Sequence, residues 1–223
     1  MAAGLSAATA VSASRWLALG AFAALALYLR AVPEPAVDRW LLDRLWEPPA
    51  TQSPVIEALT YLGDSRLLAV AALVLAVVLW RRGARWLAAL PPFAVASGVL
   101  LSYVVKLLVA RPTTWFPIWG RLTTTDDSFP SGHAVQTVVF YGLVALLALE
   151  WPPLARRRGL VLGGTAAVVA LVGYTRVYLG NHWPTDVLGG WLLGWAWLGV
   201  LGATRRRREG EPAAAAESMH KVL

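Results

Sequence analysis

Three side chains that could take part in catalysis lie in one short polar stretch, residues 175–186, between two long apolar segments. They are Arg176, His182 and Asp186, and ionisable residues in so apolar a chain indicate a functional site. Pro184 suits the first turn of a helix, so Asp186 would follow His182 by about one turn and could accept its Nδ1 proton. His182 would then be a general base or a nucleophile. A helix-capping aspartate beside an interfacial histidine explains this pair equally well.

A second candidate site lies where Pro130, Ser131, Gly132 and His133 precede a long apolar segment. Ser131 is suited to cap the helix that follows, and Gly132 lets a ligand approach the backbone closely. Free amides and the helix dipole at such an end bind anions, and His133 would lie beside the anion. The alternative is a capped helix start that carries a surface histidine.

Three cations accompany these two motifs. Lys106 lies inside the apolar run 100–109, Arg111 follows that run, and Arg176 lies at the end of another apolar segment. Each of them alone fits an anchor that reaches the membrane surface. Together, near the start of a helix, they would form a receptor for a dianionic phosphate.

Phosphoryl transfer without a metal ion would use all of these residues. His182 would attack phosphorus and form a phosphohistidine, while Asp186 stabilises the charged imidazole. His133 would protonate the leaving alcohol and then activate a water molecule. The phosphate would be held by the cations and the start of the helix: Lys106, Arg111, Arg176, Ser131 and Gly132.

A zinc site is the competing use of the same side chains, because His133, His182 and Asp186 are all possible ligands. The surrounding cations would repel a metal ion, and the chain has no cysteine to supply a thiolate. We therefore predict that the protein uses no metal and no other cofactor.

The composition is typical of an integral membrane protein, since 57% of the residues are hydrophobic and only 15% are charged. A bilayer-spanning helix takes about 20 apolar residues, and six segments qualify: 16–29, 67–80, 86–109, 130–151, 160–174 and 184–203. We predict an all-α, polytopic membrane protein whose six transmembrane helices form one bundle within residues 1–204. The remaining tail, 205–223, is predicted to be disordered and cytoplasmic. The first segment could be a signal peptide, but its weak n-region favours a retained anchor.

Two details of the helices can also be predicted. Pro91 and Pro92 should kink the third apolar segment or mark its true start. Within residues 37–46, apolar side chains recur near helical spacing and charged ones, Asp38 among them, take the other face. This pattern predicts a short amphipathic helix in the membrane interface, with a loop containing one helical turn as the alternative.

The arginine clusters indicate the orientation. With six spans, Arg15 and the clusters within 81–85, 156–158 and 205–208 share one side, which the positive-inside rule makes cytoplasmic. The net charge of +7 is thus explained by membrane anchors, and we predict no nucleic-acid partner. Both termini would be cytoplasmic, and all the candidate site residues would meet in one pocket at the outer face of the cell membrane.

Two of these patterns resemble signature motifs of the type 2 phosphatidic acid phosphatase family, the lipid phosphatase branch of a superfamily that includes vanadium haloperoxidases. The run FPSGH at 129–133 resembles the second motif, and the spacing from Arg176 to His182 to Asp186 resembles the third. The similarity extends roughly from the first to the sixth apolar segment. It implies a metal-independent lipid phosphatase, with His182 as nucleophile, Asp186 as its partner and His133 as general acid. It also implies a set of phosphate ligands: Lys106, Ser131, Gly132 and Arg176.

The chain departs from that family at two points. Thr175 stands where the family usually has serine. The family's first motif has a lysine, six residues and then Arg-Pro, whereas here only four residues separate Lys106 from Arg111, and Thr113 occupies the arginine position. Either the loop shifts so that Arg111 binds phosphate, or one phosphate contact is lost; Arg121 is another possible donor.

The substrate class stays open, because the candidate residues recognise a phosphate and not a lipid tail. Phosphatidic acid, phosphatidylglycerophosphate and undecaprenyl diphosphate all fit, with the bilayer as the surrounding partner. The competing hypothesis is a non-catalytic or transport-like membrane protein that binds anionic lipid. Two histidines with an aspartate favour the enzyme, because binding alone does not require them. Nothing in the sequence indicates an oligomeric state.

Overall fold

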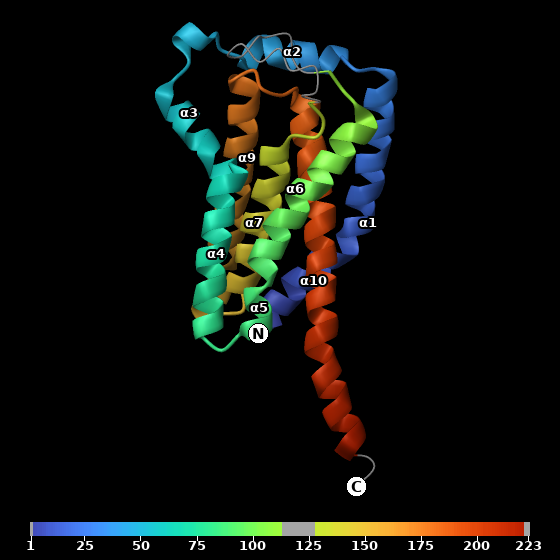
Figure 1. The fold of residues 1–223 in the computed structure, drawn as a ribbon, viewed down its shortest axis with the longest axis vertical. Helices are drawn as coiled ribbons and strands as arrows, with labels where there is room; N and C mark the ends of the chain where they lie inside the picture. Colours follow the sequence, from blue (N-terminus) through green and yellow to red (C-terminus); the bar gives the residue numbers. More distant parts are fainter. Residues whose placement is uncertain (1, 113–127, 221–223) are drawn as a thin grey trace.

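The structure, a computed structural model, describes residues 2–112 and 128–220 of the chain. Within these ranges all the regular elements are helices and no strand is present, which confirms the all-α prediction (Figure 1). The longer helices are α1 (Ala2–Ala31), α2 (Ala36–Leu45), α4 (Ser65–Arg81), α6 (Leu90–Val109), α7 (Gly132–Ala148), α9 (Arg158–Tyr178) and α10 (Pro184–His220). The shorter ones are α3 (Pro54–Thr60), α5 (Arg85–Ala88), α8 (Pro152–Ala155) and the two 3-10 turns η1 (Pro49–Thr51) and η2 (Tyr61–Gly63).

The helices give fewer membrane crossings than the six apolar segments of the sequence. Three stretches of the described chain are long and apolar enough to cross a bilayer: Arg85–Val109, Arg158–Tyr178 and Pro184–Arg205. Counting each bent helix pair near α1 and α4 as one span raises the number to five. α7 is apolar but only 17 residues long. The protein is thus a multi-pass membrane protein, and the six-span count stays a prediction.

α7 is the central helix of the bundle and contacts α1, α4, α6, α9 and α10 (Figure 1). Most of its residues are buried, because neighbours surround it on every side. Two glycines let α10 approach it closely: a Cβ at Gly190 would lie 2.6 Å from that of Ala134, and one at Gly194 would lie 2.8 Å from that of Val138. Because the other helices separate α7 from the lipid, α7 can be shorter than a helix that faces the bilayer.

The outer helices expose apolar side chains, as expected where lipid replaces water. On α4, Leu73 and Val77 are more than half exposed, and on α6 the same holds for Leu100 and Leu107. α6 begins at Leu90 and has two prolines in its first turn, so Pro91 and Pro92 mark its start as predicted.

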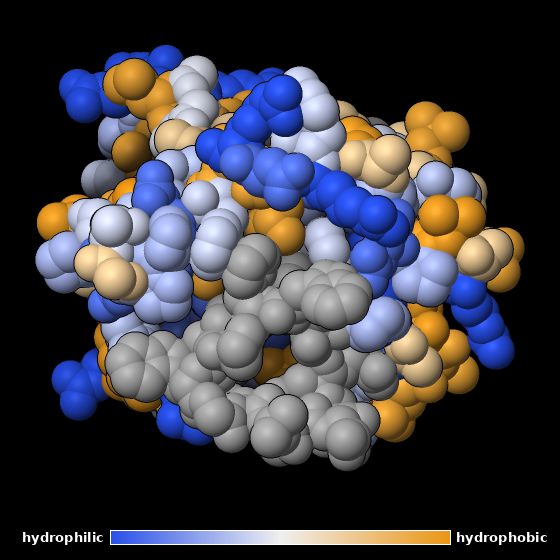
Figure 2. All heavy atoms as spheres, turned by 90° about the horizontal axis from the view of Figure 1, so that it is seen from above, coloured by the Kyte–Doolittle hydropathy of each residue, from blue (hydrophilic) through white to orange (hydrophobic). Residues whose placement is uncertain are grey.

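α2 crosses one end of the bundle at a steep angle to the other helices (Figure 1). The predicted helix over 37–46 is therefore present, but one part of its interpretation was wrong. Asp38 does not take the solvent face; it is fully buried, with Leu42 beneath the same helix. Figure 2 looks onto this end, where a band of hydrophilic residues runs across the upper part of the view and hydrophobic ones lie around parts of the rim.

The C-terminal tail differs from the prediction as well. α10 continues as a helix to His220 and extends beyond the bundle, so the described part of the expected disordered tail is helical (Figure 1). Arginine, alanine and glutamate make up 11 of residues 205–220, and these strong helix formers continue a helix that the bundle has already nucleated.

Candidate active site

The polar stretch found in the sequence folds into a tight turn between α9 and α10, and this turn presents His182. Gly180 takes a left-handed backbone conformation (φ 68°) that reverses the chain after α9. The His182 amide then donates to the Arg176 carbonyl oxygen at 3.2 Å. Because Pro184 begins α10, Asp186 lies in the first turn of that helix, one turn from His182.

His182 and Asp186 lie next to each other. The distance from His182 Nδ1 to Asp186 Oδ2 is 3.4 Å, which is long for a hydrogen bond. Nδ1 has no closer partner among the described residues, and Asp186 Oδ2 accepts from the Trp183 amide at 2.9 Å. Catalytic hydrogen bonds are often long without substrate and tighten in the complex. The side chains are thus placed for the predicted contact.

Burial lowers the pKa of His182 to about 4. Asp186 acts in the opposite direction and raises this pKa, while Arg176 and Lys106 lower it further. The imidazole is therefore neutral at pH 7. With the Nδ1 side facing Asp186, a lone pair on Nε2 is available to attack an electrophile.

A cavity of about 210 Å³ opens beside His133, at the end of the bundle where α2 lies. It is lined by residues from α4, α6, α7 and the adjacent η2 turn: Gly63, Ser65, Val99, Ser102, Tyr103, Lys106, Gly132, His133 and Gln136. Three of the predicted site residues therefore share one cavity. His182 is not part of this lining, but it lies near enough to Lys106 for that positive charge to lower the pKa of its imidazole.

The start of α7, at Ser131 and Gly132, lies against the start of α10. Ser131 occupies the N-cap position, but its hydroxyl makes no capping bond and, within residues 2–112 and 128–220, has no partner at all. Our prediction of a side-chain cap was therefore wrong. The Ser131 amide instead donates to the Asp186 carbonyl oxygen at 3.0 Å, which ties α7 to α10. The backbone at Gly132 is open, since a Cβ there would meet nothing within 4 Å.

Arg176 is held by polar neighbours on two sides. One guanidinium nitrogen donates to Thr60 Oγ1 at 3.0 Å. With its amide oxygen turned toward the guanidinium, Asn181 accepts from both terminal nitrogens, at 3.1 and 3.2 Å. The third nitrogen, Nε, is buried and has no partner in the described part of the chain. This fixed cation with one unused donor fits the predicted phosphate ligand.

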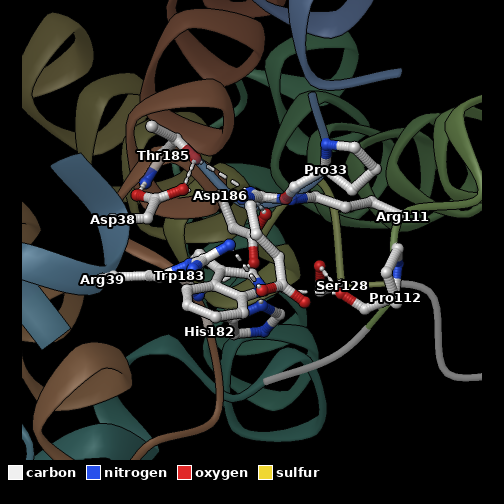
Figure 3. Close-up of polar contacts among 11 residues, drawn as sticks. Pro33, Asp38, Arg39, Arg111, Pro112, Ser128, His182, Trp183, Thr185 and Asp186 are labelled. Atoms are coloured by element: carbon white, nitrogen blue, oxygen red, sulfur yellow. Dashed lines mark hydrogen bonds and ion pairs between the residues drawn. The ribbon is translucent and has the colours of Figure 1, made fainter. Parts of the chain in front are cut away.

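Arg111 occupies a different place from the predicted one. Its side chain is fully buried, and it does not line the cavity that contains Lys106 and His133. NH1 donates to Asp186 Oδ1 and, at 2.8 Å, to Thr185 Oγ1, while NH2 donates to Asp38 Oδ2 at 2.6 Å (Figure 3). The guanidinium therefore contacts Asp186, the carboxylate beside His182, and Asp38.

Asp38 completes this buried group. Its Oδ1 accepts from the Thr185 amide at 2.9 Å, and its Oδ2 accepts from the Thr185 hydroxyl at 2.5 Å (Figure 3). Both carboxylates and the guanidinium are 0% exposed. We call Asp38, Arg111 and Thr185 the clamp. It binds Asp186 Oδ1 and leaves Oδ2 toward His182, and it attaches α2 to the start of α10.

Sequence reasoning missed four residues of this region: Asp38, Thr60, Gln136 and Thr185. Each belongs to a segment where a polar residue has an ordinary explanation, such as the charged face of an amphipathic helix or the first turn of a helix. Asp38, Thr60 and Gln136 are distant from His182 in the chain, and Thr185, three residues after it, is at a position where a first-turn threonine is ordinary. Thr113 and Arg121, the other residues considered for the first motif, lie outside the described residues. Among those described, no group of three His, Asp or Glu side chains could hold a metal ion.

Comparison with known proteins agrees with this arrangement. A family model described as "PAP2 superfamily" matches residues 86–209, which is more than half of the chain. The undecaprenyl-diphosphatase of Sulfolobus acidocaldarius is 46% identical over 81 residues, covering 34% of this chain and 32% of that protein. The phosphatidylglycerophosphatase B of Bacillus subtilis is 31% identical over 141 residues, covering 63% of this chain and 68% of that protein.

The fold has a solved counterpart as well. The crystal structure of a transmembrane PAP2-type phosphatidylglycerolphosphate phosphatase from Bacillus subtilis superposes with a TM-score of 0.76 at 24% sequence identity. The match covers 87% of this chain and 96% of that one. The helical arrangement is thus shared over nearly the whole solved protein, whereas the Sulfolobus protein is matched over only about a third of its length.

Proposed function

Because the chain belongs to the PAP2 superfamily, we propose that it is a membrane phosphatase that hydrolyses a lipid phosphate or diphosphate through a phosphohistidine. The observation that carries this proposal is a pair of buried donors next to a neutral histidine. The Ser131 hydroxyl and the Arg176 Nε–H have no acceptor among the described residues. A bound phosphate would supply acceptors for both while His182 attacks it.

The reaction proceeds in two steps. In the first, His182 Nε2 bonds to phosphorus, the bond from phosphorus to the leaving oxygen breaks, and His133 gives that oxygen its proton. In the second, the water oxygen bonds to phosphorus, the bond from phosphorus to His182 Nε2 breaks, and His133 takes the proton from the water. The products are an alcohol (or a lipid monophosphate, from a diphosphate) and inorganic phosphate, and both histidines return to their starting states.

The phosphate's charge is balanced by fixed donors rather than by a metal ion in this scheme. Lys106 and Arg176 supply positive charge, and the positive end of the α7 dipole lies at Gly132, which lines the same cavity as Lys106. Asp186 stabilises the charge that develops on His182 when the phosphohistidine forms. Such preorganised groups lower a barrier most where water is excluded, as in this partly enclosed cavity.

We also propose that both termini are cytoplasmic and that the site faces outward. α4 ends at Arg81, α9 begins at Arg158, and both lie at the ends of helices remote from His182. Arg205, far along α10, pairs with Glu150 at the same remote end. These basic residues support a cytoplasmic assignment for that end of the bundle.

The test is phosphate release by the purified, detergent-solubilised protein in the presence of EDTA. We expect turnover of at least one of three substrates: phosphatidate, phosphatidylglycerophosphate or an isoprenyl diphosphate. His182→Ala should lower the rate by roughly 10⁴-fold or more, because it removes the nucleophile. With ³²P-labelled substrate, the wild type should also give an acid-labile, base-stable phosphoprotein that this variant lacks.

His220→Ala, at the far end of α10, is the matched control and should keep full activity. Full activity in His182→Ala would refute the assignment of the nucleophile. Binding of anionic lipid without any turnover by the wild type would favour the non-catalytic alternative instead.

A further inference from the structure

The cavity beside His133 extends deeper into the bundle than a phosphate alone requires. α7 carries His133 near the end of the bundle and Gln136 three residues further in, about 4.5 Å along the helix axis. α6 runs in the opposite sense, and it carries Lys106 near the same end and Ser102 one turn further in. The cavity therefore has two levels: an upper level with Lys106 and His133, and a lower level with Ser102 and Gln136.

Gln136 is the unusual residue of the lower level. It is only 2% exposed, and its Nε2 donates to the Val95 carbonyl oxygen of α6 at 3.0 Å. Its amide oxygen, Oε1, is buried and accepts no hydrogen bond within the described part of the chain. A buried acceptor without a partner is costly inside a membrane protein, where water cannot satisfy it.

The packing around Gln136 fixes which edge of the amide is used. Gly98 of α6 lies against it, and a Cβ at Gly98 would come within 3.0 Å of Nε2. The missing side chain at Gly98 thus makes room for the carboxamide, whose nitrogen is anchored on α6. Ser102 is also satisfied internally, since its hydroxyl donates to the Gly98 carbonyl oxygen at 2.8 Å. Oε1 of Gln136 is therefore the unused polar group of this level.

The lower level leads toward the lipid-facing side of the bundle. Val99 and Tyr103 line the same cavity and are 44% and 59% exposed on α6. A substrate with its phosphate between Lys106 and His133 would pass its leaving group by Gln136 and its tail out beside these two residues.

We propose that the lower level is a subsite for an alcohol hydroxyl on the leaving group, which donates a hydrogen bond to Gln136 Oε1. The substrate class it selects is a phosphate monoester of a glycerol-type polyol that carries a free hydroxyl next to the ester. An isoprenyl diphosphate would instead bring an anionic phosphate to the carbonyl oxygen of Gln136, and the two would repel. The inference rests on the proposed phosphatase function and specifies its substrate.

The test compares two lipids that differ by one hydroxyl: 1-acyl-glycerol-3-phosphate and its 2-deoxy analogue, the phosphate of a monoacylated propane-1,3-diol. For the wild type we expect kcat/KM to be about tenfold higher with the hydroxylated lipid, the usual worth of one net hydrogen bond. In Gln136→Leu, which keeps the volume and removes the acceptor, this ratio should fall to about 1. The rate on the deoxy lipid should change little.

Thr137→Val is the matched control on the same helix, because Thr137 is buried but bonds to the carbonyl oxygens of His133 and Ala134 and does not line the cavity. It should keep the wild-type ratio. Gln136→Met serves the same purpose as Gln136→Leu if the latter does not fold, as judged by its thermal melt. A Gln136 variant that slows both lipids equally would overturn the proposal, since Gln136 would then hold a water molecule or only pack.

Binding separates this inference from the proposed function. Phosphonate analogues of the same two lipids cannot be hydrolysed, and their dissociation constants need no turnover. A preference for the hydroxylated phosphonate that Gln136→Leu abolishes would support the subsite even if no hydrolysis occurred. Equal affinities for both phosphonates, together with equal rates, would refute the subsite while leaving the phosphatase function intact.

Discussion

The two sides of Asp186 differ in how their polar groups are satisfied. On one side, the clamp of Asp38, Arg111 and Thr185 is completely buried, and its members bond to one another and to Asp186. On the other side lie three of the five buried side-chain atoms that have no partner among the described residues: the hydroxyl of Ser131, Nε of Arg176 and Oε1 of Gln136. The two sides meet at Asp186, in the first turn of α10.

This difference distinguishes polar groups that stabilise the structure, on the clamp side, from polar groups available to a ligand, on the cavity side. A buried ion pair whose partners all belong to the chain stabilises a position, and removing one member leaves an uncompensated charge. A buried donor or acceptor without a partner destabilises the free protein and gains its hydrogen bond when a ligand arrives. Substitutions in the clamp should therefore change stability first, and substitutions on the cavity side should change catalysis first.

Arg111→Met should have the largest effect of the substitutions that test this contrast. It leaves Asp38 and Asp186 buried without their cation, so we expect the free energy of unfolding to fall by roughly 3–5 kcal/mol. Activity should be lost along with the fold, which thermal melts in detergent would show. Arg39→Met is the control, because the Arg39 side chain is 63% exposed in its pair with Glu34 and should contribute less than about 1 kcal/mol.

If Arg111→Met melts like Arg39→Met while its KM rises sharply, the clamp interpretation would fail. Arg111 would then contact the phosphate, as its position after Lys106 first suggested.

Ser131→Ala should have a smaller effect than Arg111→Met, and it should lower activity without lowering stability. Removing a buried hydroxyl that has no partner in the described chain should leave the melting temperature unchanged or slightly higher. kcat/KM should fall about tenfold, because the phosphate loses one donor. Thr175→Val provides the contrast: its hydroxyl contacts Thr60 and the Val172 carbonyl oxygen, so stability should fall by about 1 kcal/mol. Destabilisation by Ser131→Ala would mean that its hydroxyl is structural.

The smallest effect expected is a shift along the pH axis of the acidic limb of kcat/KM. With the pKa of His182 at about 4, the nucleophile is protonated only below that value. We therefore expect kcat/KM to fall as pH drops through about 4, after the substrate's own ionisation, measured by ³¹P NMR, is divided out. Lys106→Met removes a charge that lowers this pKa, so the acidic limb should move upward. A limb that stays in place would mean that another group controls it.

The sequence predicted most of the fold because hydrophobic segments and helix ends are local properties. The apolar runs became α1, α4, α6, α7, α9 and α10, and Pro91 and Pro184 each mark the start of a helix. The helical continuation to His220 was missed, because a composition typical of disorder also suits a helix once a bundle has started it. The helices give three to five membrane crossings where the sequence pattern predicts six, because α7 is short and two other candidates are bent.

For the candidate site, the chain by itself determined the residues that stand at fixed spacings on one turn or one helix. Two groups are close in space because they are close in sequence. One is the pair His182 and Asp186, and the other is Ser131, Gly132 and His133. Only the tertiary structure decided what Arg111 contacts and that Asp38 is buried. Those two residues are 73 positions apart, and the charge of a side chain says which partners it needs but not which segment of the chain will supply them.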